Sequence, residues 1–217
     1  MTENERRMRI GEMRKSIESE KFSSKTFRDD DQSDPKTGAK LRKYVENWAE
    51  VKKNNLGLMF HGDVGGGKTF WAACVANALI EKEVDDGAWK SPVWMTTVQK
   101  LRWGMQQNFE KDKARILRQI TETQLLILDD FGFEKETKTA NESLFEIVDQ
   151  RYMAGRPLIV TTNLTLDEIR FEQDMARRRV YDRIIEMCST PVYISANGRR
   201  QKIAREKSEA LRKILDI

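Results

Sequence analysis

One eight-residue segment constrains the fold of this chain more than any other feature. It reads Gly62-Asp-Val-Gly-Gly-Gly-Lys-Thr69 and matches the pattern G-x-x-x-x-G-K-[ST] at every fixed position. The glycines let successive backbone N–H groups point at a phosphate, and the helix expected to follow presents its positive end to the same anion. Lys68 can then reach the β- and γ-phosphates, and the Thr69 hydroxyl can ligate Mg²⁺. The predicted nucleotide-binding residues are Gly62, Asp63, Val64, Gly65, Gly66, Gly67, Lys68, Thr69 and Phe70.

Short apolar runs alternate with helical stretches on both sides of this segment. Strands are predicted at residues 56–60, 92–95, 125–128, 157–160 and 191–194. The spacing of apolar residues predicts helices between them, including 70–82 directly after the glycine-rich turn and 175–187 before the last run. Short apolar strands separated by helices indicate a parallel sheet that is covered on both faces. The predicted fold class is therefore α/β.

The 217 residues provide for one domain and a short extension. Residues 1–35 are predicted to be a charged N-terminal extension and linker, and residues 36–217 to be the domain. A thin apolar stripe of Ile10, Met13 and Ile17 predicts a helix in the extension. The turn-rich stretch 23–38 is expected to be a linker.

Composition excludes several classes of protein. With 39% hydrophobic residues the chain can form a core, so wholesale disorder is excluded. No apolar run is long enough for a membrane-spanning helix or a signal peptide. Two cysteines and one histidine cannot supply a structural zinc site, and we expect a reducing cytoplasm. The net charge of +4 is weak evidence for nucleic-acid binding, because both signs are mixed along the chain.

Two carboxylates, Asp129 and Asp130, directly follow the apolar run at 125–128. A magnesium nucleotide site needs one acid at a strand end to hold the metal and a second group to orient the attacking water. We assign the first role to Asp129 and the second to Asp130. An acidic turn is the alternative, but the phosphate loop about 60 residues earlier favours the metal site.

A third polar motif, Thr161-Thr-Asn163, follows the run at 157–160. A side-chain amide beside the γ-phosphate can position the attacking water and report hydrolysis. An isolated asparagine is more often a turn residue or a helix cap. The order of the three motifs favours the sensor role for Asn163.

The motifs GDVGGGKT, LLILDD, IVTTN and RVYDRI, in this order, resemble those of the AAA+ ATPases of the DnaC/DnaI helicase-loader type, with which the relatives of the transposition helper IstB share the arrangement. The resemblance covers about residues 26–203, including Thr26-Phe27 and the stretch 44–48. It implies a P-loop NTPase of the AAA+, ASCE type. In its parallel five-stranded sheet, the strand before Asn163 lies between the strands of the other two motifs.

The resemblance also assigns roles to two arginines. It implies that Arg183 is an arginine finger acting in trans on a neighbour's nucleotide, and that Arg200 is the sensor-2 arginine, with Arg199 as the alternative. The residues by themselves favour a solvated helix face for an arginine-rich helix. The predicted catalytic residues are Asp130, Asn163, Arg183 and Arg200, and the predicted metal ligands are Thr69 and Asp129.

The chain departs from the family pattern in two ways. Many AAA+ proteins have glutamate at the position of Asp130, which is one methylene shorter, so we expect slow hydrolysis. Helicase loaders usually carry a sizeable N-terminal domain that grips the helicase, whereas about 25 residues precede Thr26 here. Either the chain is a short form, of the kind a phage or prophage carries, or the helicase-gripping domain is absent from it.

The resemblance implies an ATPase that uses ATP and Mg²⁺ as a switch while it loads a DnaB-type replicative ring helicase onto single-stranded DNA. It further implies an ATP-bridged oligomer in the cytoplasm, with no membrane contact. Two alternatives stay open. One is a transposition helper that binds DNA and recruits a transposase, and the other is an adaptor that binds ATP but hydrolyses almost none.

Overall fold

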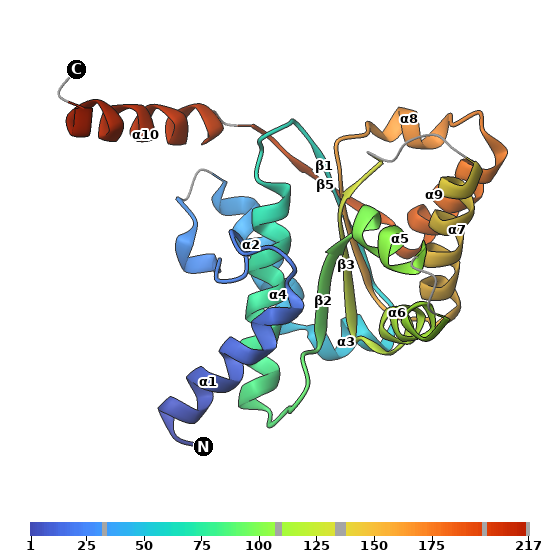
Figure 1. The fold of residues 1–217 in the computed structure, drawn as a ribbon, viewed down its shortest axis with the longest axis horizontal. Helices are drawn as coiled ribbons and strands as arrows, with labels where there is room; N and C mark the ends of the chain where they lie inside the picture. Colours follow the sequence, from blue (N-terminus) through green and yellow to red (C-terminus); the bar gives the residue numbers. More distant parts are fainter. Residues whose placement is uncertain (32–33, 107–109, 133–137, 197–198, 216–217) are drawn as a thin grey trace.

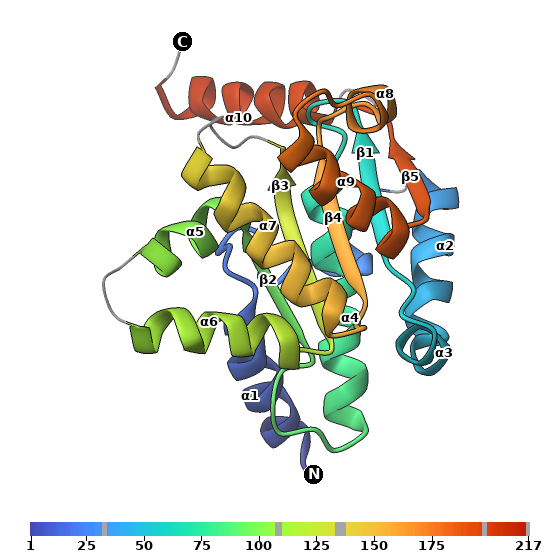
Figure 2. The same ribbon diagram turned by 90° about the vertical axis from the view of Figure 1, so that its right-hand side faces the viewer.

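A parallel five-stranded sheet runs through the middle of the protein (Figures 1 and 2). The computed structural model describes residues 1–31, 34–106, 110–132, 138–196 and 199–215, with the backbone alone at 106, 110, 138–140 and 199–203. The strands are β1 Leu58–Gly62, β2 Val93–Thr97, β3 Leu125–Phe131, β4 Leu158–Thr162 and β5 Thr190–Ile194. Their order in the sheet is β2-β3-β4-β1-β5, and every pairing is parallel. The predicted α/β class is confirmed, and so is the place of β4 between β1 and β3.

Helices cover both faces of this sheet. They are α1 Glu3–Met13, α2 Pro35–Glu46, α3 Trp48–Lys53, α4 Lys68–Asp85, α5 Val98–Gln106, α6 Glu110–Glu122, α7 Lys138–Met153, α8 Leu166–Arg170, α9 Met175–Met187 and α10 Arg199–Leu215. Helices α1, α2 and α4 lie on one face (left in Figure 1), and α5, α6, α7 and α9 lie on the other, which faces the viewer in Figure 2. None of the described helices has the length and apolar character needed to cross a membrane.

Strand β3 shows how the apolar runs build two cores. Leu125 and Ile127 pack into the cluster beneath α4, whereas Leu126 and Leu128 pack into the cluster beneath α7 and α9. Successive side chains of a strand point to opposite faces, so a strand covered on both sides must be apolar throughout. All four side chains are fully buried.

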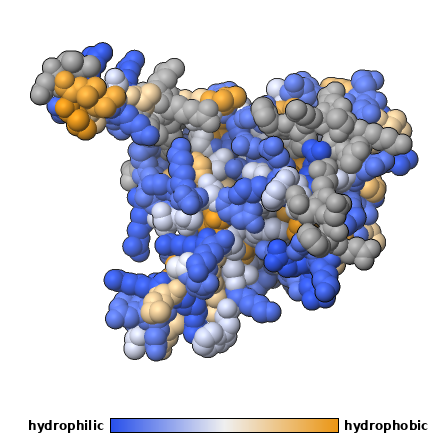
Figure 3. Space-filling model, in the orientation of Figure 1, coloured by the Kyte–Doolittle hydropathy of each residue, from blue (hydrophilic) through white to orange (hydrophobic). Residues whose placement is uncertain are grey.

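Residues 1–31 pack against the sheet domain. Ile10, Met13 and Ile17 are buried against α4 as the stripe predicts, and Ile17 forms a parallel β-bridge with Met95 at the β2 edge of the sheet. The extension therefore shares the core of the domain. At its other end the chain leaves the body as α10, whose tip carries exposed Leu211, Ile214 and Leu215 (upper left in Figure 3).

The stretch 23–38, expected to be a linker, is ordered in its described parts. A short 3₁₀ helix, η2 (Phe27–Asp29), begins with a capping box at Thr26, and Phe27 is buried beside Trp71. Helix α2 begins at Pro35, inside the stretch expected to be a linker, because Asp34 caps it and proline is favoured in the first turn. Two of the polar residues that resemble a linker, Thr26 and Asp34, are helix caps.

Candidate nucleotide site

The loop Gly62–Thr69 joins the end of β1 to the start of α4, as the motif requires. Gly67 precedes α4 with a φ of +98°, which favours glycine, and no side chain caps the helix there. The first N–H groups of α4 thus face the loop, where an anion can accept from them. Gly66 lies against β5, because a Cβ at this position would come within 2.8 Å of the Ile194 carbonyl oxygen.

Lys68 lies inside this loop. Its Nζ donates to the carbonyl oxygens of Gly62 and Asp63, at 2.9 Å each, and the side chain is buried. The same residue lines the cavity next to the loop. A fixed positive charge at this position is suited to binding the phosphates of a nucleotide.

Asp63, predicted to bind the nucleotide, has a different set of partners. Its carboxylate accepts hydrogen bonds from the Tyr193 hydroxyl, at 3.0 Å, and from the Ala196 backbone N–H, at 3.1 Å. The Asp63 side chain thus ties the loop to the chain that follows β5. Its backbone carbonyl accepts from Lys68, so Asp63 acts on the site by shaping the loop.

The Asp129 carboxylate is buried at the carboxyl end of the sheet. Its Oδ1 accepts from the Thr69 hydroxyl at 2.9 Å and from the Thr161 hydroxyl at 2.6 Å. Burial raises the pKa of Asp129 and the charge of Asp130 adds to the rise, while the hydrogen bonds from Thr161 and Thr69 oppose it. Two adjacent oxygen ligands, the Thr69 hydroxyl and this carboxylate, have the chemistry that Mg²⁺ prefers.

Asp130 is exposed and lines the cavity. Its φ is +54°, and the register between β3 and β4 is irregular from Leu128 to Phe131. Aspartate is among the residues that tolerate the left-handed region, and unusual backbone angles of this kind cluster at functional sites. The irregularity separates two consecutive carboxylates, so Asp129 is buried beside Thr69 while Asp130 borders open space.

Thr161 is a site residue that the sequence did not single out. Its fully buried hydroxyl donates to Asp129 and accepts from the Asp130 backbone N–H at 3.0 Å. One hydroxyl on β4 therefore holds both consecutive acids of β3. The signal was present in the motif that ends at Asn163, because a buried threonine beside an acidic strand end needs a polar partner.

Asn163 follows β4 and lines the same cavity as Lys68, Thr69 and Asp130. The Thr162 hydroxyl fixes the turn before it, donating to the Phe131 carbonyl at 2.8 Å and accepting from the Leu164 N–H at 3.0 Å. The three motifs, far apart in the sequence, thus meet at one edge of the sheet.

The cavity that these residues share has a volume of about 470 Å³, within the usual range for a site that holds a small ligand. A second wall comes from the N-terminal extension and was missed in the sequence analysis, which assigned most of it to a linker. Glu206 of α10 also borders the cavity. The residues of the N-terminal wall are Lys21, Phe22, Lys25, Asp29 and Asp31.

Arg183, one of the two predicted arginines, is not among the described residues that line this cavity. Arg183 of α9 donates to Asp149 of α7 at 2.8 Å, and its guanidinium lies over the Phe145 ring at 4.6 Å. The side chains of Arg199 and Arg200 lie outside the described residues.

The chain is similar to known ATP-binding proteins in sequence and in structure. The family model of the IstB-like ATP binding proteins matches residues 1–209. The chain belongs to this family. The replicative helicase loader DnaI of Bacillus subtilis is 27% identical over 188 residues, which are 81% of this chain and 58% of DnaI. An ATP-binding protein in an insertion sequence of Mycobacterium tuberculosis is 30% identical over 141 residues, which are 64% of this chain and 53% of that protein.

The fold of this IstB-like protein is shared with a solved helicase loader. The crystal structure of the DnaC helicase loader covers 82% of this chain and 99% of its own, with a TM-score of 0.62 at 23% identity. That likeness confirms the expected P-loop NTPase fold of the AAA+ type. The chain is therefore an IstB-like ATP-binding protein with the fold of the DnaC helicase loader. The IstB-like chain spans just over half the length of each of these two relatives.

Proposed function

We propose that this protein is an ATP-dependent helicase loader that places a DnaB-type ring helicase on single-stranded DNA. The observation that carries the proposal is the similarity to the helicase loader DnaI across 81% of the chain, combined with a complete set of phosphate-site motifs around one cavity. ATP hydrolysis acts as a switch for release of the helicase. The loader works in the cytoplasm, as a domain of residues 36–217 with the extension 1–35.

In this proposal the chain divides the chemistry of hydrolysis among four groups. Lys68 and the first N–H groups of α4 bind the phosphates. Thr69 and Asp129 would hold Mg²⁺, which would neutralise charge on the phosphate oxygens. Asp130 orients the attacking water and takes up its proton, because its exposed carboxylate borders the cavity. Asn163 senses the γ-phosphate.

Assembly completes the proposed site. Arg183 is supplied in trans across an ATP-bridged interface, and Arg200 contacts the nucleotide as the sensor-2 arginine. The position of Arg183 on α9 supports this, because it does not border the cavity of its own chain. Hydrolysis then depends on a neighbour, which suits a switch.

A transposition helper is the second candidate function. The family model bears the IstB name, and an ATP-binding protein in an insertion sequence is 30% identical over 141 residues. A helper of this kind binds DNA and recruits a transposase. It uses the same ATP site, so the partner protein decides between the two functions.

The deciding experiment mixes the purified protein separately with a replicative helicase and with a transposase. We expect ATP-dependent co-elution with the replicative helicase of the source organism, and transfer of that helicase to protein-coated single-stranded DNA, scored by unwinding. The Lys68→Ala variant is the control and should lose both. Co-elution with a transposase and none with the helicase would favour the second candidate. ATP binding with no DNA-stimulated turnover would favour the adaptor.

A further inference from the structure

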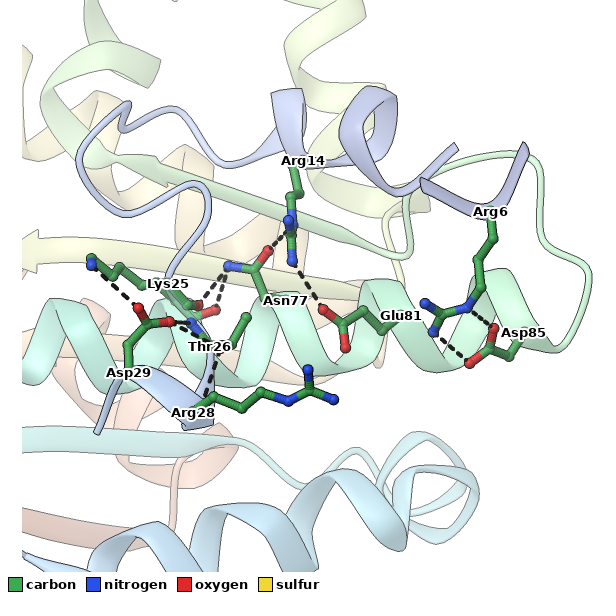
Figure 4. A network of polar contacts seen from close by, with 10 residues as sticks. Arg6, Arg14, Lys25, Thr26, Arg28, Asp29, Asn77, Glu81 and Asp85 are labelled. Carbon is green, nitrogen blue, oxygen red and sulfur yellow. Dashed lines mark hydrogen bonds and ion pairs between the residues drawn. The ribbon is translucent and has the colours of Figure 1, made fainter. Parts of the chain in front are cut away.

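The N-terminal wall of the nucleotide cavity is held to α4 by a buried side chain, Asn77. This residue lies in the middle of α4 and is fully buried (Figure 4). Its Nδ2 donates to the Lys25 carbonyl at 2.8 Å and to the Ala73 carbonyl at 3.1 Å. Lys25 borders the cavity, so Asn77 connects the helix that follows the phosphate loop to the N-terminal wall of the site.

Arg14 fixes the orientation of the Asn77 amide. Its Nε donates to Asn77 Oδ1 at 2.7 Å, and its Nη2 donates to Glu81 Oε1 at 2.9 Å (Figure 4). An arginine can only donate, so the oxygen of the amide must face Arg14 and its NH₂ group must face Lys25. The docking of the N-terminal extension on α4 thereby sets the direction of the Asn77–Lys25 bond.

From Lys25 the hydrogen bonds continue into the wall. The Lys25 N–H donates to the Phe22 carbonyl at 3.0 Å, and the Phe22 side chain packs on the core and borders the cavity. On the other side, Asp29 accepts from the Thr26 N–H at 2.8 Å and from the Lys25 ammonium at 3.4 Å. Hydrogen bonds therefore connect the wall from Phe22 to Asp29, and Asn77 anchors this part to α4.

We propose that Asn77 and Arg14 are positioning residues that set how tightly the protein holds the nucleoside part of its nucleotide. The inference rests on the proposed ATP site. The phosphates are bound by the loop at Lys68, so the base and ribose extend to another part of the cavity. The N-terminal wall supplies the aromatic ring of Phe22 and the charges of Lys25 and Asp29 there. Aromatic rings stack on any base, so the ring suits this role.

The test compares ATP with inorganic tripolyphosphate, which has the phosphates and no nucleoside. In Asn77→Ala the wall loses its anchor, and we expect ATP affinity to fall about three- to tenfold, the equivalent of one hydrogen bond, while tripolyphosphate affinity stays unchanged. Arg14→Gln, at a more exposed site, should lower ATP affinity in the same direction. Titration calorimetry measures both ligands, and circular dichroism checks the fold of each variant.

Two control variants make the outcomes separable. Arg6→Ala removes another ion pair between the extension and α4, the one from Arg6 to Asp85 at 2.6 Å (Figure 4). Asp85 lies at the far end of α4 from the phosphate loop. The Arg6→Ala variant should therefore bind ATP like the wild type. Lys68→Ala should lose both ligands. Equal ATP affinity in Asn77→Ala, Arg14→Gln and the wild type would overturn the inference, and so would parallel losses of ATP and tripolyphosphate. A wild type that binds neither ligand would instead overturn the proposed nucleotide site.

Discussion

The guanidinium of Arg183 and the carboxylate of Asp149 form an ion pair of 2.8 Å that joins α9 to α7. Both side chains are about a quarter exposed, so the pair lies at the surface of its own subunit. An arginine that acts on a neighbour's nucleotide must leave such a partner or share it when the subunits assemble. Substitution of Asp149, the other member of the pair, therefore provides a matched control for the proposed trans role of Arg183.

We expect Arg183→Ala to bind ATP normally through its own loop and to lose turnover. An arginine supplied in trans is worth about 10³–10⁵ in rate in other nucleotide hydrolases. We expect a smaller loss here, because the shorter Asp130 should already make basal turnover slow. Mixing with Lys68→Ala protein should restore part of the activity, because the Lys68→Ala subunit retains its Arg183. Wild-type turnover per subunit should rise with protein concentration.

Asp149→Ala is the control for this prediction. It breaks the same ion pair but keeps the arginine, and a partly exposed pair is worth about 1 kcal/mol or less, so turnover should stay near the wild-type rate. Equal losses in Asp149→Ala and Arg183→Ala, with no recovery on mixing, would reduce Arg183 to a structural role.

The two acids of β3 should respond differently to substitution. Asp129→Asn is expected to impair magnesium-dependent ATP binding and turnover together, because it removes a charged ligand. The same change should stabilise the ligand-free protein against heat, because burial raises the pKa of Asp129 and its charge is costly there. Asp130→Asn should keep ATP binding and lose about 10²-fold or more in turnover. Asp130→Asn protein with wild-type turnover would contradict the role of that residue.

The strands and the phosphate-site motifs could be predicted from the sequence because each is local. An apolar run of four or five residues, such as 125–128, can form a strand buried on both faces, and the spacing of the loop 62–69 follows from the shape of a phosphate. The polar residues at strand ends meet in space because parallel strands end at one edge of the sheet. These parts of the site needed no knowledge of the tertiary packing.

The missed parts depend on contacts between distant segments. Thr161 acts on Asp129 only because β4 lies beside β3 and their register is irregular there. The N-terminal wall depends on the bond from Asn77 to the Lys25 carbonyl, 52 positions away. Helix caps such as Thr26 and Asp34 are residue types that also occur in linkers, so the sequence does not distinguish a capped helix from a linker. The packing of Phe27 on Trp71 is what distinguishes them here.

Arg151 of α7 should be a major source of stability. It is fully buried and donates to the carbonyls of Ile120, Thr123 and Gln124, and to that of Pro157. Arg151→Met removes these donors and leaves the carbonyl oxygens at the end of α6 without hydrogen-bond partners. This should lower the free energy of unfolding, measured in urea, by about 3–5 kcal/mol. Arg156→Ala removes one exposed bond, to the Glu122 carbonyl, and should cost about 0.5 kcal/mol or less. Similar urea unfolding midpoints for Arg151→Met and Arg156→Ala would contradict a major contribution of Arg151 to stability.

Thr161→Val should make the activity of the protein more sensitive to acid. Burial raises the pKa of Asp129 and the hydrogen bond from Thr161 lowers it, so removing the hydroxyl should raise this pKa further. Asp129 is then protonated up to a higher pH and cannot bind a metal there. We expect the acid limb of turnover to move to higher pH, with a loss of about tenfold where the wild type is still active.

The stability of Thr161→Val provides an independent check on the direction of the pKa change of Asp129. An acid whose pKa is raised by folding lowers stability above that pKa, and the loss disappears as the pH falls below the ordinary aspartate value. Thr161→Val should therefore be destabilised more at neutral than at acidic pH, beyond the constant cost of the Asp130 N–H that loses its acceptor. Thr161→Ser keeps the hydroxyl and should follow the wild type in both measurements. If Thr161→Val and Thr161→Ser had the same pH profiles, the Thr161–Asp129 bond would have no part in tuning the metal site.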